Sequence, residues 1–212
     1  LLGQCARHTP AAAERLWLDL GGRSLTPAQL CRRLATALQL PNDDANETGL
    51  IERLHERAGR LWIFIDDYPR QADEALDACL DRLFAAAPAH VTWWVASRRT
   101  PAWNLPRLLL QGDLLELKGE ELALDEQGLV ELLAALQVNL ADDLRQALLH
   151  SSEGWLAAIR LLLLDAGEDA LRQRLQDGCP LLRDYVQREV LADLGDELRS
   201  DLHALALLPR FA

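Results

Sequence analysis

Residues 61–69 read Leu-Trp-Ile-Phe-Ile-Asp-Asp-Tyr-Pro, so that five consecutive apolar side chains run directly into a pair of aspartates. An apolar run without alternation is typical of a strand that is covered on both faces, as strands are in a parallel sheet. We therefore predict a buried parallel strand over residues 61–65 that ends in two carboxylates.

The neighbouring sequence repeats this pattern on either side. Further strands are predicted at residues 16–20, 91–96 and 114–117. Helical periodicity separates them, and the first helix begins at Thr26-Pro27, a hydroxyl at the N-cap followed by proline at the first helical position. The other helices carry apolar residues at Leu50, Ile51, Leu54 and Ala58, and at Ala72, Ala75, Leu76, Cys79, Leu80 and Leu83. Alternating strands and helices predict an α/β fold with a parallel sheet.

After Gly119 the strand signals stop and an all-α bundle is predicted. Asp125-Glu126 and Asp142-Asp143 each place acidic side chains at a helix start, where the helix dipole favours them. Further helices are predicted at residues 155–164, 169–176 and 182–194. The chain is thus predicted to change from a sheet domain to a helical region near residue 120.

Charge and composition exclude several classes of protein. The 212 residues are 50% hydrophobic and carry a formal net charge of -11, which repels phosphate backbones and anionic membrane surfaces. No apolar run reaches the ~20 residues of a membrane span, because Arg160 interrupts the best one, and no signal peptide begins the chain. Four scattered cysteines without a C-x-x-C pair favour a reducing cytoplasm. Since the chain contains no Met, we expect it to be a piece of a longer protein.

Two predicted strands end in polar side chains that suit a nucleotide. Ligands of open parallel sheets lie beyond the carboxyl ends of the strands, where Asp66-Asp67 and Ser97-Arg98 are expected. An apolar strand followed by paired carboxylates is the Walker B arrangement, in which one carboxylate holds Mg²⁺ and its neighbour polarises an attacking water. The Arg98 guanidinium on the adjacent strand matches the oxygens of a γ-phosphate. The alternative is that the two aspartates only solvate a strand end or cap the next helix.

Five segments in one order resemble MalT-like, LuxR-type transcriptional activators, which belong to the STAND class of ATPases related to AAA+ proteins. They are Leu61–Tyr68 (Walker B strand), Val95–Pro101 (sensor arginine), Arg107–Leu117, Glu153–Leu161 (the Gly-Trp motif of a helical lid) and Leu182–Leu191 (the entry to a winged helix). The resemblance implies a P-loop NTPase domain over residues 1–119, a helical lid over 120–168 and the start of a winged-helix region over 169–212.

The same resemblance implies roles for particular residues. Asp66 would bind Mg²⁺, Asp67 would orient water, and Arg98 with Ser97 would face the γ-phosphate. Gly154 and Trp155 would let the lid contact the nucleotide, although a structural role, with a helix break at Gly154 and a core anchor at Trp155, is the favoured interpretation of that element and is compatible with the contact. The implied mechanism is an ATP/ADP switch with slow hydrolysis. An inducer, either a small molecule or a protein, together with ATP would permit self-association, and DNA would be bound by a helix-turn-helix beyond residue 212.

Two departures from the family pattern matter. The phosphate-binding loop G-x-x-x-x-G-K-[ST] is absent, so we expect this chain by itself to bind ATP weakly. Pro69 replaces a residue that is polar, commonly His, in relatives. A degenerate interaction scaffold that has lost the nucleotide is therefore an alternative to the switch, and a metabolic P-loop kinase is a third possibility, disfavoured by the large helical half.

The remaining aromatic and histidine residues suggest no other chemistry. Trp17, Trp62, Trp93 and Trp94 fall within predicted strands and are expected in the core, whereas Trp103, in a proline-flanked loop, is expected to be exposed. His55 stands between Glu52 and Glu56 on a helix without a second histidine at metal spacing, which is typical of a surface residue.

Overall fold

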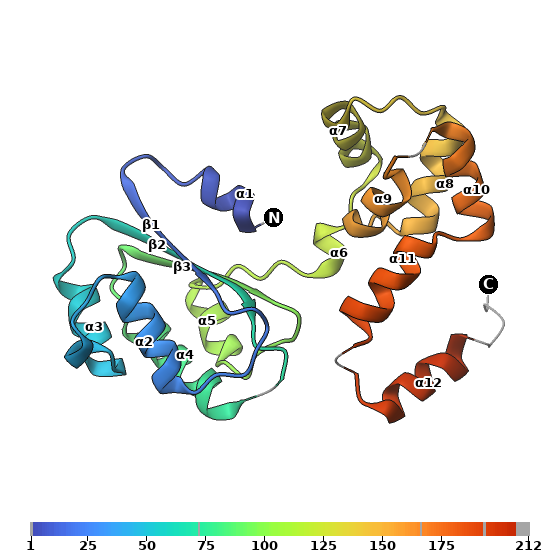
Figure 1. Ribbon diagram of the computed structural model, residues 1–212. Coiled ribbons are helices and arrows are strands. Elements are labelled where there is room, and N and C mark those ends of the chain that lie inside the picture. Colours follow the sequence, from blue (N-terminus) through green and yellow to red (C-terminus); the bar gives the residue numbers. More distant parts are fainter. Residues whose placement is uncertain (1, 72, 166, 193, 207–212) are drawn as a thin grey trace. The chain divides into compact units, whose positions relative to one another are not determined.

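The computed structural model describes residues 2–71, 73–165, 167–192 and 194–206 (Figure 1). The chain divides into two compact units, Leu1–Leu115 and Glu116–Ala212, and each is described here by itself.

The first unit is an α/β unit, as the sequence predicts. Its elements are α1 (Leu2–Arg7), β1 (Ala13–Asp19), α2 (Pro27–Ala37), the 3-10 turn η1 (Asn42–Asp44), α3 (Glu47–Glu56), β2 (Arg60–Tyr68), α4 (Glu74–Ala86), β3 (Val91–Ser97) and α5 (Leu105–Gln111). Ala72, which the sequence assigned to the helix after β2, lies outside the described residues. The N-cap predicted at Thr26 is present and is part of a capping box: the Thr26 side chain accepts from the Gln29 amide, and the Gln29 side chain accepts from the Thr26 amide.

The sheet has three parallel strands in the order β1-β2-β3, with β2 in the centre. Parallel strands leave their carboxyl ends at one edge, so Asp19, Asp66 and Ser97 all finish on the same side of the sheet. The pairing of β2 with β3 is regular up to Ile65 and shifts between Ile65 and Tyr68. This irregularity falls on the two predicted aspartates.

Helices α2, α3 and α4 lie on one side of the sheet and α1 on the other (Figure 1). The main core forms on the first side, where Leu16, Leu18, Ile63 and Ile65 pack against the helices. On the other side an aromatic row crosses the strands, with Trp17 stacked on Phe64 and Phe64 stacked on Trp94 at ring-centre distances of 5.8 Å.

Two expectations about tryptophan are wrong. Trp17 is 43% exposed, because β1 is an edge strand whose outer face is only partly covered. Trp103 is half-buried instead of exposed, since its ring packs edge-on against Tyr68 and Phe84 at 5.7 and 5.0 Å. The proline-flanked loop folds back onto the core rather than into solvent.

The second unit is helical. It contains α6 (Gly119–Leu122), α7 (Glu126–Leu136), α8 (Asp142–Ser152), α9 (Leu156–Leu163), α10 (Glu168–Asp177), α11 (Pro180–Tyr185), the π-helical turn η2 (Val186–Val190) and α12 (Asp196–Ala206). Its core is built from one face of α7 to α10, with Leu133, Leu148, Ile159 and Leu171 at the centre. The predicted fold class is therefore confirmed: a parallel α/β sheet with flanking helices is followed along the chain by a helical region.

One predicted strand is not formed, and one predicted helix is shorter than expected. Residues 114–117 have no strand partner, and Leu115 is 80% exposed in the segment that joins the two units. The helix predicted over 182–194 is formed as far as Val190, as α11 up to Tyr185 and then as η2, and residue 193 lies outside the described residues. The spacing of leucines alone does not predict whether such a segment becomes a strand, a helix or a loop, because several backbone conformations are compatible with the same apolar pattern.

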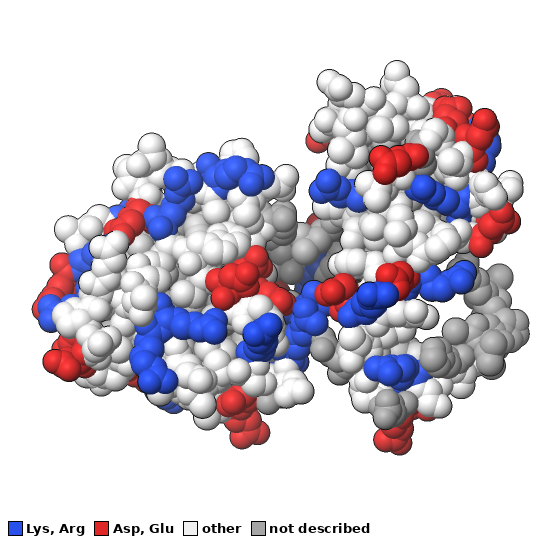
Figure 2. All heavy atoms as spheres, in the orientation of Figure 1, with Lys and Arg blue, Asp and Glu red and all other residues white. Residues whose placement is uncertain are grey.

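Basic and acidic side chains are interspersed over the face of each unit that Figure 2 shows. None of the helices in the described part of the chain combines the length and the apolar character that a bilayer crossing needs.

Candidate functional site

The candidate site lies at the carboxyl ends of β2 and β3 and centres on Asp67. This residue has a φ of 46°, in the left-handed region that costs a residue with a side chain about 1–2 kcal/mol. The unusual backbone coincides with the irregular pairing after Ile65, and such bulges redirect side chains at functional edges of sheets. The Asp67 amide donates to the Asp66 carboxylate at 3.0 Å, which ties the two aspartates together.

The structure brings Asp67 and Arg98 together, as the sequence analysis expected. The Arg98 Nε lies 3.7 Å from Asp67 Oδ1, and both side chains keep contact with solvent. Ser97 is used differently: its hydroxyl accepts from the Arg99 amide at 3.3 Å and so shapes the loop after β3.

Sequence reasoning missed Arg70 and Gly22. The Arg70 Nη2 lies 3.6 Å from Asp67 Oδ2, on the other carboxylate oxygen from Arg98. Gly22, in the turn after β1, donates its amide to the Asp67 carbonyl at 2.7 Å and accepts from the Arg70 amide at 3.1 Å. The Gly21-Gly22 pair was a visible signal, but without the fold it indicated only a strand end.

A second missed feature is the Asp77 cluster, which consists of Asp77, Arg99 and Tyr68. The Asp77 side chain is 1% exposed, and it accepts two bonds from the Arg99 guanidinium at 2.7 and 2.9 Å and one from the Tyr68 hydroxyl at 2.8 Å. It also accepts from the Ala102 amide at 2.8 Å, while Arg99 Nε donates to the Pro69 carbonyl at 3.0 Å. The cluster fixes both loops that carry Asp67 and Arg98, because its members are their chain neighbours.

The electrostatics of the cluster agree with this geometry. Burial opposes ionisation of Asp77, but the bonds from Arg99, Ala102 and Tyr68 together hold the pKa of Asp77 below its usual value. Burial and the bond to Asp77 raise the pKa of Tyr68 well above its usual range. The cluster is therefore an ionised carboxylate with a neutral phenol and a cationic guanidinium.

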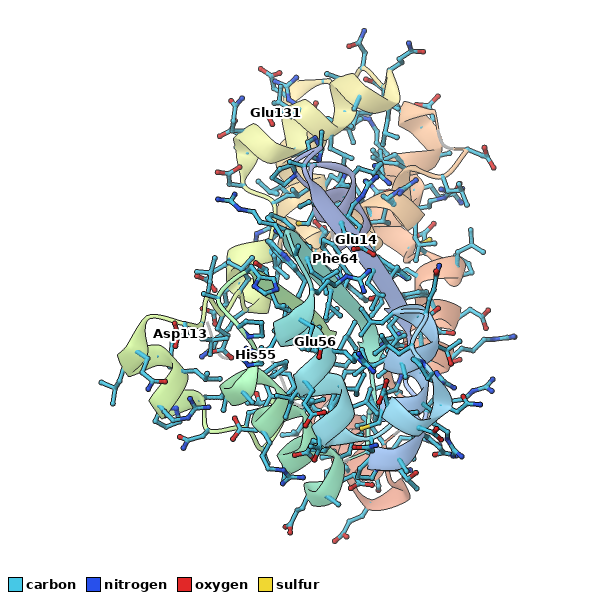
Figure 3. All side chains as sticks on the ribbon, turned by 90° about the vertical axis from the view of Figure 1, so that its left-hand side faces the viewer. Glu14, His55, Glu56, Phe64, Asp113 and Glu131 are labelled. Carbon is cyan, nitrogen blue, oxygen red and sulfur yellow. The ribbon has the colours of Figure 1, made fainter. Side chains whose placement is uncertain are left out.

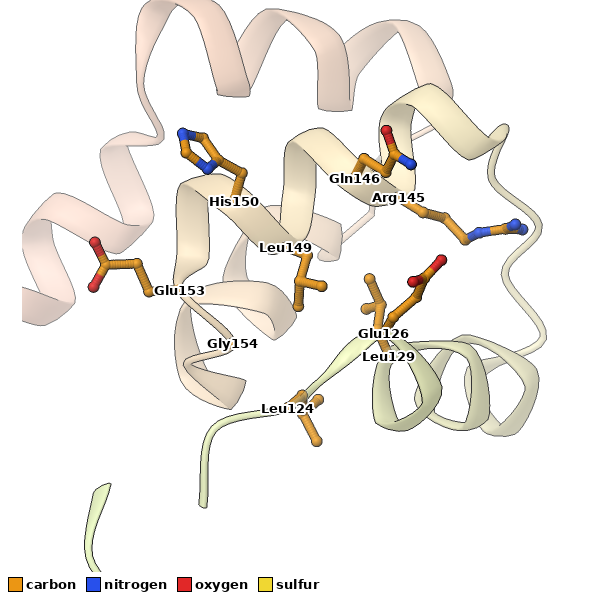
Figure 4. Close-up of a pocket in the computed structure, with 9 residues that line it drawn as sticks. All are labelled: Leu124, Glu126, Leu129, Arg145, Gln146, Leu149, His150, Glu153 and Gly154. Atoms are coloured by element: carbon orange, nitrogen blue, oxygen red, sulfur yellow. The ribbon is translucent and has the colours of Figure 1, made fainter. Parts of the chain in front are cut away.

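Gly154 and Trp155 lie in the second unit, so their predicted contact with a nucleotide stays a prediction. Gly154 has a φ of 75°, and its carbonyl accepts from the Leu124 amide at 2.9 Å in the turn between α8 and α9. It also lines a cavity of about 380 Å³ whose apolar wall includes Leu124, Leu129 and Leu149 (Figure 4). Trp155 is 41% exposed, so the alternative reading of Trp155 as a core anchor is wrong.

The backbone explains why residue 154 is glycine, and this gives a first prediction. A Cβ at Gly154 would lie 2.4 Å from the Leu124 carbonyl oxygen, whereas a Cβ at Gly178 would meet nothing closer than 3.6 Å at a similar positive φ. We expect Gly154→Ala to destabilise the second unit by about 2–5 kcal/mol and Gly178→Ala by at most about 2 kcal/mol. Amide hydrogen exchange of α8 and α9 under native conditions measures both; equal protection in the two variants would show that the close contact is relieved cheaply.

His55 makes a structural contact outside the candidate site. His55 and Glu56 lie in the last turn of α3, and the His55 Nε2 is 2.9 Å from the Ala86 carbonyl at the end of α4 (Figure 3). Within the described ranges, no group of three or more His, Cys, Asp and Glu residues is arranged to hold a metal ion.

Comparison with known proteins adds relatives but no family assignment, since no family model matches the chain. Over 191 residues, or 85% of the chain, it is 31% identical to "Serine/threonine-protein kinase PknK" of Mycobacterium tuberculosis, of which it spans 17%. It is 27% identical over 165 residues, or 74% of the chain, to "HTH-type transcriptional regulator MalT" of Yersinia enterocolitica, of which it spans 18%. It is 24% identical over 180 residues, or 80% of the chain, to MalT of Yersinia pestis, of which it spans 20%.

One solved structure, "Structure of Drosophila ORC bound to GC-rich DNA and Cdc6", aligns with 89% of the chain and 81% of its own length. The TM-score is 0.35 and the identity 15%, values too low to support an inference. The chain is thus similar, at low identity, to about a fifth or less of MalT and PknK.

Proposed function

We propose that this chain is a nucleotide-binding regulatory module of a MalT-like transcriptional regulator. The observation that carries the proposal is the contact between Asp67 and Arg98 at 3.7 Å, on adjacent parallel strands at the carboxyl edge of the sheet. Ligands of open parallel sheets bind at that edge. The similarity to MalT from two Yersinia species supports the regulatory setting.

The residues at this edge fit a magnesium-bound nucleotide. Mg²⁺ is held in phosphate sites by one or two carboxylates, with phosphate oxygens and water as the other ligands. Asp66 would supply such a carboxylate, since its partly exposed side chain lies near the carboxyl end of the central strand. When bound, Mg²⁺ would neutralise charge that develops on the phosphates.

The other roles belong to the chain's own side chains. Asp67 would orient a water molecule, and Arg98 would bind the terminal phosphate through its planar fork of donors. Exchange of ADP for ATP would then alter the loops held by the Asp77 cluster. Self-association, the inducer, the cytoplasmic location and DNA binding by a segment beyond residue 212 are parts of the same proposal.

A degenerate interaction scaffold is the second candidate function. The observation in its favour is that Asp67 already faces Arg70 and Arg98, an arrangement that is stable without a nucleotide. The following experiment separates the two candidates.

In a protein that joins this chain to an upstream phosphate-binding loop, we expect Arg98→Ala to weaken ATP binding about tenfold more than ADP binding. The reason is that a charge-assisted contact to the γ-phosphate is lost only for ATP. Isothermal titration calorimetry with both nucleotides measures the ratio. Arg107→Ala is the matched control, because Arg107 pairs with Asp81 at 3.5 Å on α4. Equal losses for ATP and ADP would contradict the role of Arg98, and no binding by the parent protein would favour the scaffold.

A further inference from the structure

Asp67 is placed between two guanidinium groups that approach its two carboxylate oxygens separately. Arg98 lies 3.7 Å from Oδ1 and Arg70 lies 3.6 Å from Oδ2, and the three side chains are 28%, 44% and 21% exposed in the order Asp67, Arg98, Arg70. Arg98 follows from the resemblance described above, whereas the position of Arg70 follows from the fold alone.

The approach of Arg70 depends on Gly22. A Cβ at Gly22 would lie 2.6 Å from Arg70 Nε and 3.0 Å from Asp67 Oδ2, so any side chain there would displace the Arg70 side chain. Two backbone hydrogen bonds lock this fit, from the Gly22 amide to the Asp67 carbonyl and from the Arg70 amide to the Gly22 carbonyl. Gly21 has the same φ of 63° and open space around it, which shows that the crowding is specific to Gly22.

Charge balance has a direct consequence for a metal ion. Asp66 and Asp67 carry two negative charges, and the guanidinium groups of Arg70 and Arg98 beside Asp67 carry two positive ones, which weakens the attraction of this acidic pair for a divalent cation. An oxyanion offers the two guanidiniums new partners and leaves the carboxylates to the cation. Cation and anion should therefore bind together more readily than either binds separately.

We propose that Arg70 prevents a divalent cation from binding Asp66 and Asp67 unless a phosphate-bearing ligand binds with it. The inference rests on the proposed nucleotide site and adds a control on its metal occupancy. Arg70 acts through Asp67 and is in this sense a positioning residue. It makes the site respond to the cation–phosphate complex and ignore the free ion.

The test uses Mn²⁺ as the probe and the 212-residue chain, with no nucleotide present. We expect Arg70→Gln to tighten Mn²⁺ binding about three- to tenfold, since it removes one positive charge beside the carboxylates. Arg60→Gln, at the opposite end of β2, removes the same charge and should leave Mn²⁺ binding unchanged. Electron paramagnetic resonance of free Mn²⁺ measures the affinities. A gain in affinity is an outcome that simple loss of structure does not produce.

Gly22→Ala and Gly21→Ala form a second matched pair. Both impose the same backbone strain, but only Gly22→Ala displaces Arg70, so it should reproduce the tighter Mn²⁺ binding of Arg70→Gln. Adding inorganic phosphate should strengthen Mn²⁺ binding more in the wild type than in Arg70→Gln, because only the wild type offers Arg70 to the anion.

Unchanged Mn²⁺ affinity in Arg70→Gln, or an equal gain in Arg60→Gln, would overturn the inference. Equal effects of phosphate on wild type and Arg70→Gln would do the same. None of these measurements requires ATP, so a negative result for Arg70 would not affect the test of Arg98 with ATP and ADP. Conversely, a parent protein that binds no nucleotide would refute the proposed function while the Mn²⁺ result for Arg70 stood.

Discussion

Asp77→Ala is expected to destabilise the first unit by about 3–5 kcal/mol. Asp77 is 1% exposed and is bonded to Arg99, Tyr68 and the Ala102 amide. Alanine would leave a guanidinium that is 16% exposed without its carboxylate, together with a buried phenol that has lost its acceptor. Breaking one side of a buried ion pair costs more than the pair itself contributes, because the remaining charge stays desolvated.

Asp81→Ala provides the matched control for this loss. Asp81 stands one helical turn further along α4, and its ion pair with Arg107 at 3.5 Å is 25% exposed on the aspartate side. Ion pairs of that kind contribute about 0–1 kcal/mol. Urea unfolding followed by tryptophan fluorescence suits the comparison, since five of the six tryptophans lie in the first unit. Similar losses in both variants would mean that the Asp77 cluster is no stronger than a surface pair.

The Asp77 cluster should also affect how the free energy of unfolding depends on pH in the acidic range. The pKa of Asp77 is lowered in the folded state, so its contribution is complete above the unfolded value of about 3.9 and is lost as the pH falls through the folded value. Asp77→Asn carries no titrating group there. We therefore expect the wild type to lose stability more steeply than Asp77→Asn below about pH 4, as measured by urea unfolding across that range. Parallel pH profiles would contradict an ionised Asp77.

The fold was predictable where one local signal dominates. The apolar run over residues 61–65 leaves few alternatives to a buried strand, and the Thr26-Pro27 pair marks a helix start whose capping box is present. The strand predicted at residues 114–117 is not formed, because a short apolar stretch becomes a strand only where a partner strand lies beside it. Leu115 has none in the described structure and faces solvent instead.

The site was predictable only in part, because its chemistry depends on contacts between distant segments. Asp66 and Asp67 follow the apolar run of β2, and Arg98 follows β3, so parallel pairing is enough to predict that they share an edge. Asp77 has no such signal: in sequence it is one more acidic residue near the start of a helix, where the helix dipole explains it. Its burial appears only when the loop after β3 folds back and brings Arg99 onto it.

The contact between Arg70 and Gly22 could not be predicted from local sequence either. A glycine pair after a strand predicts a turn, but the reason that residue 22 lacks a side chain is the Arg70 guanidinium 2.6 Å from the missing Cβ. Gly22 and Arg70 belong to the turns after two different strands. Local sequence propensity therefore does not predict that they come into contact.

The largest expected effect on activity is the loss of ATP hydrolysis in Asp66→Asn and Asp67→Asn. In a protein that joins this chain to an upstream phosphate-binding loop, each should lower turnover at least about a hundredfold, since metal and water positioning make up most of phosphoryl-transfer catalysis. Both substitutions keep the side-chain shape and remove only charge, so the sheet should remain folded. Steady-state release of phosphate measures the turnover.

Asp19→Asn is the control that separates a specific role of the acidic pair from a general effect of charge at this edge. Asp19 is the direct cross-strand partner of Asp66 and ends β1 at the same edge, but its carboxylate accepts from the Gly21 amide at 2.8 Å and closes a turn. Its replacement should therefore leave most of the turnover, because it changes the charge of the edge without touching the acidic pair. If all three variants lost activity alike, general electrostatics of the edge would be responsible. If Asp66→Asn and Asp67→Asn kept full turnover, the carboxylates would be structural, and the edge would serve as an interaction surface instead of a nucleotide site.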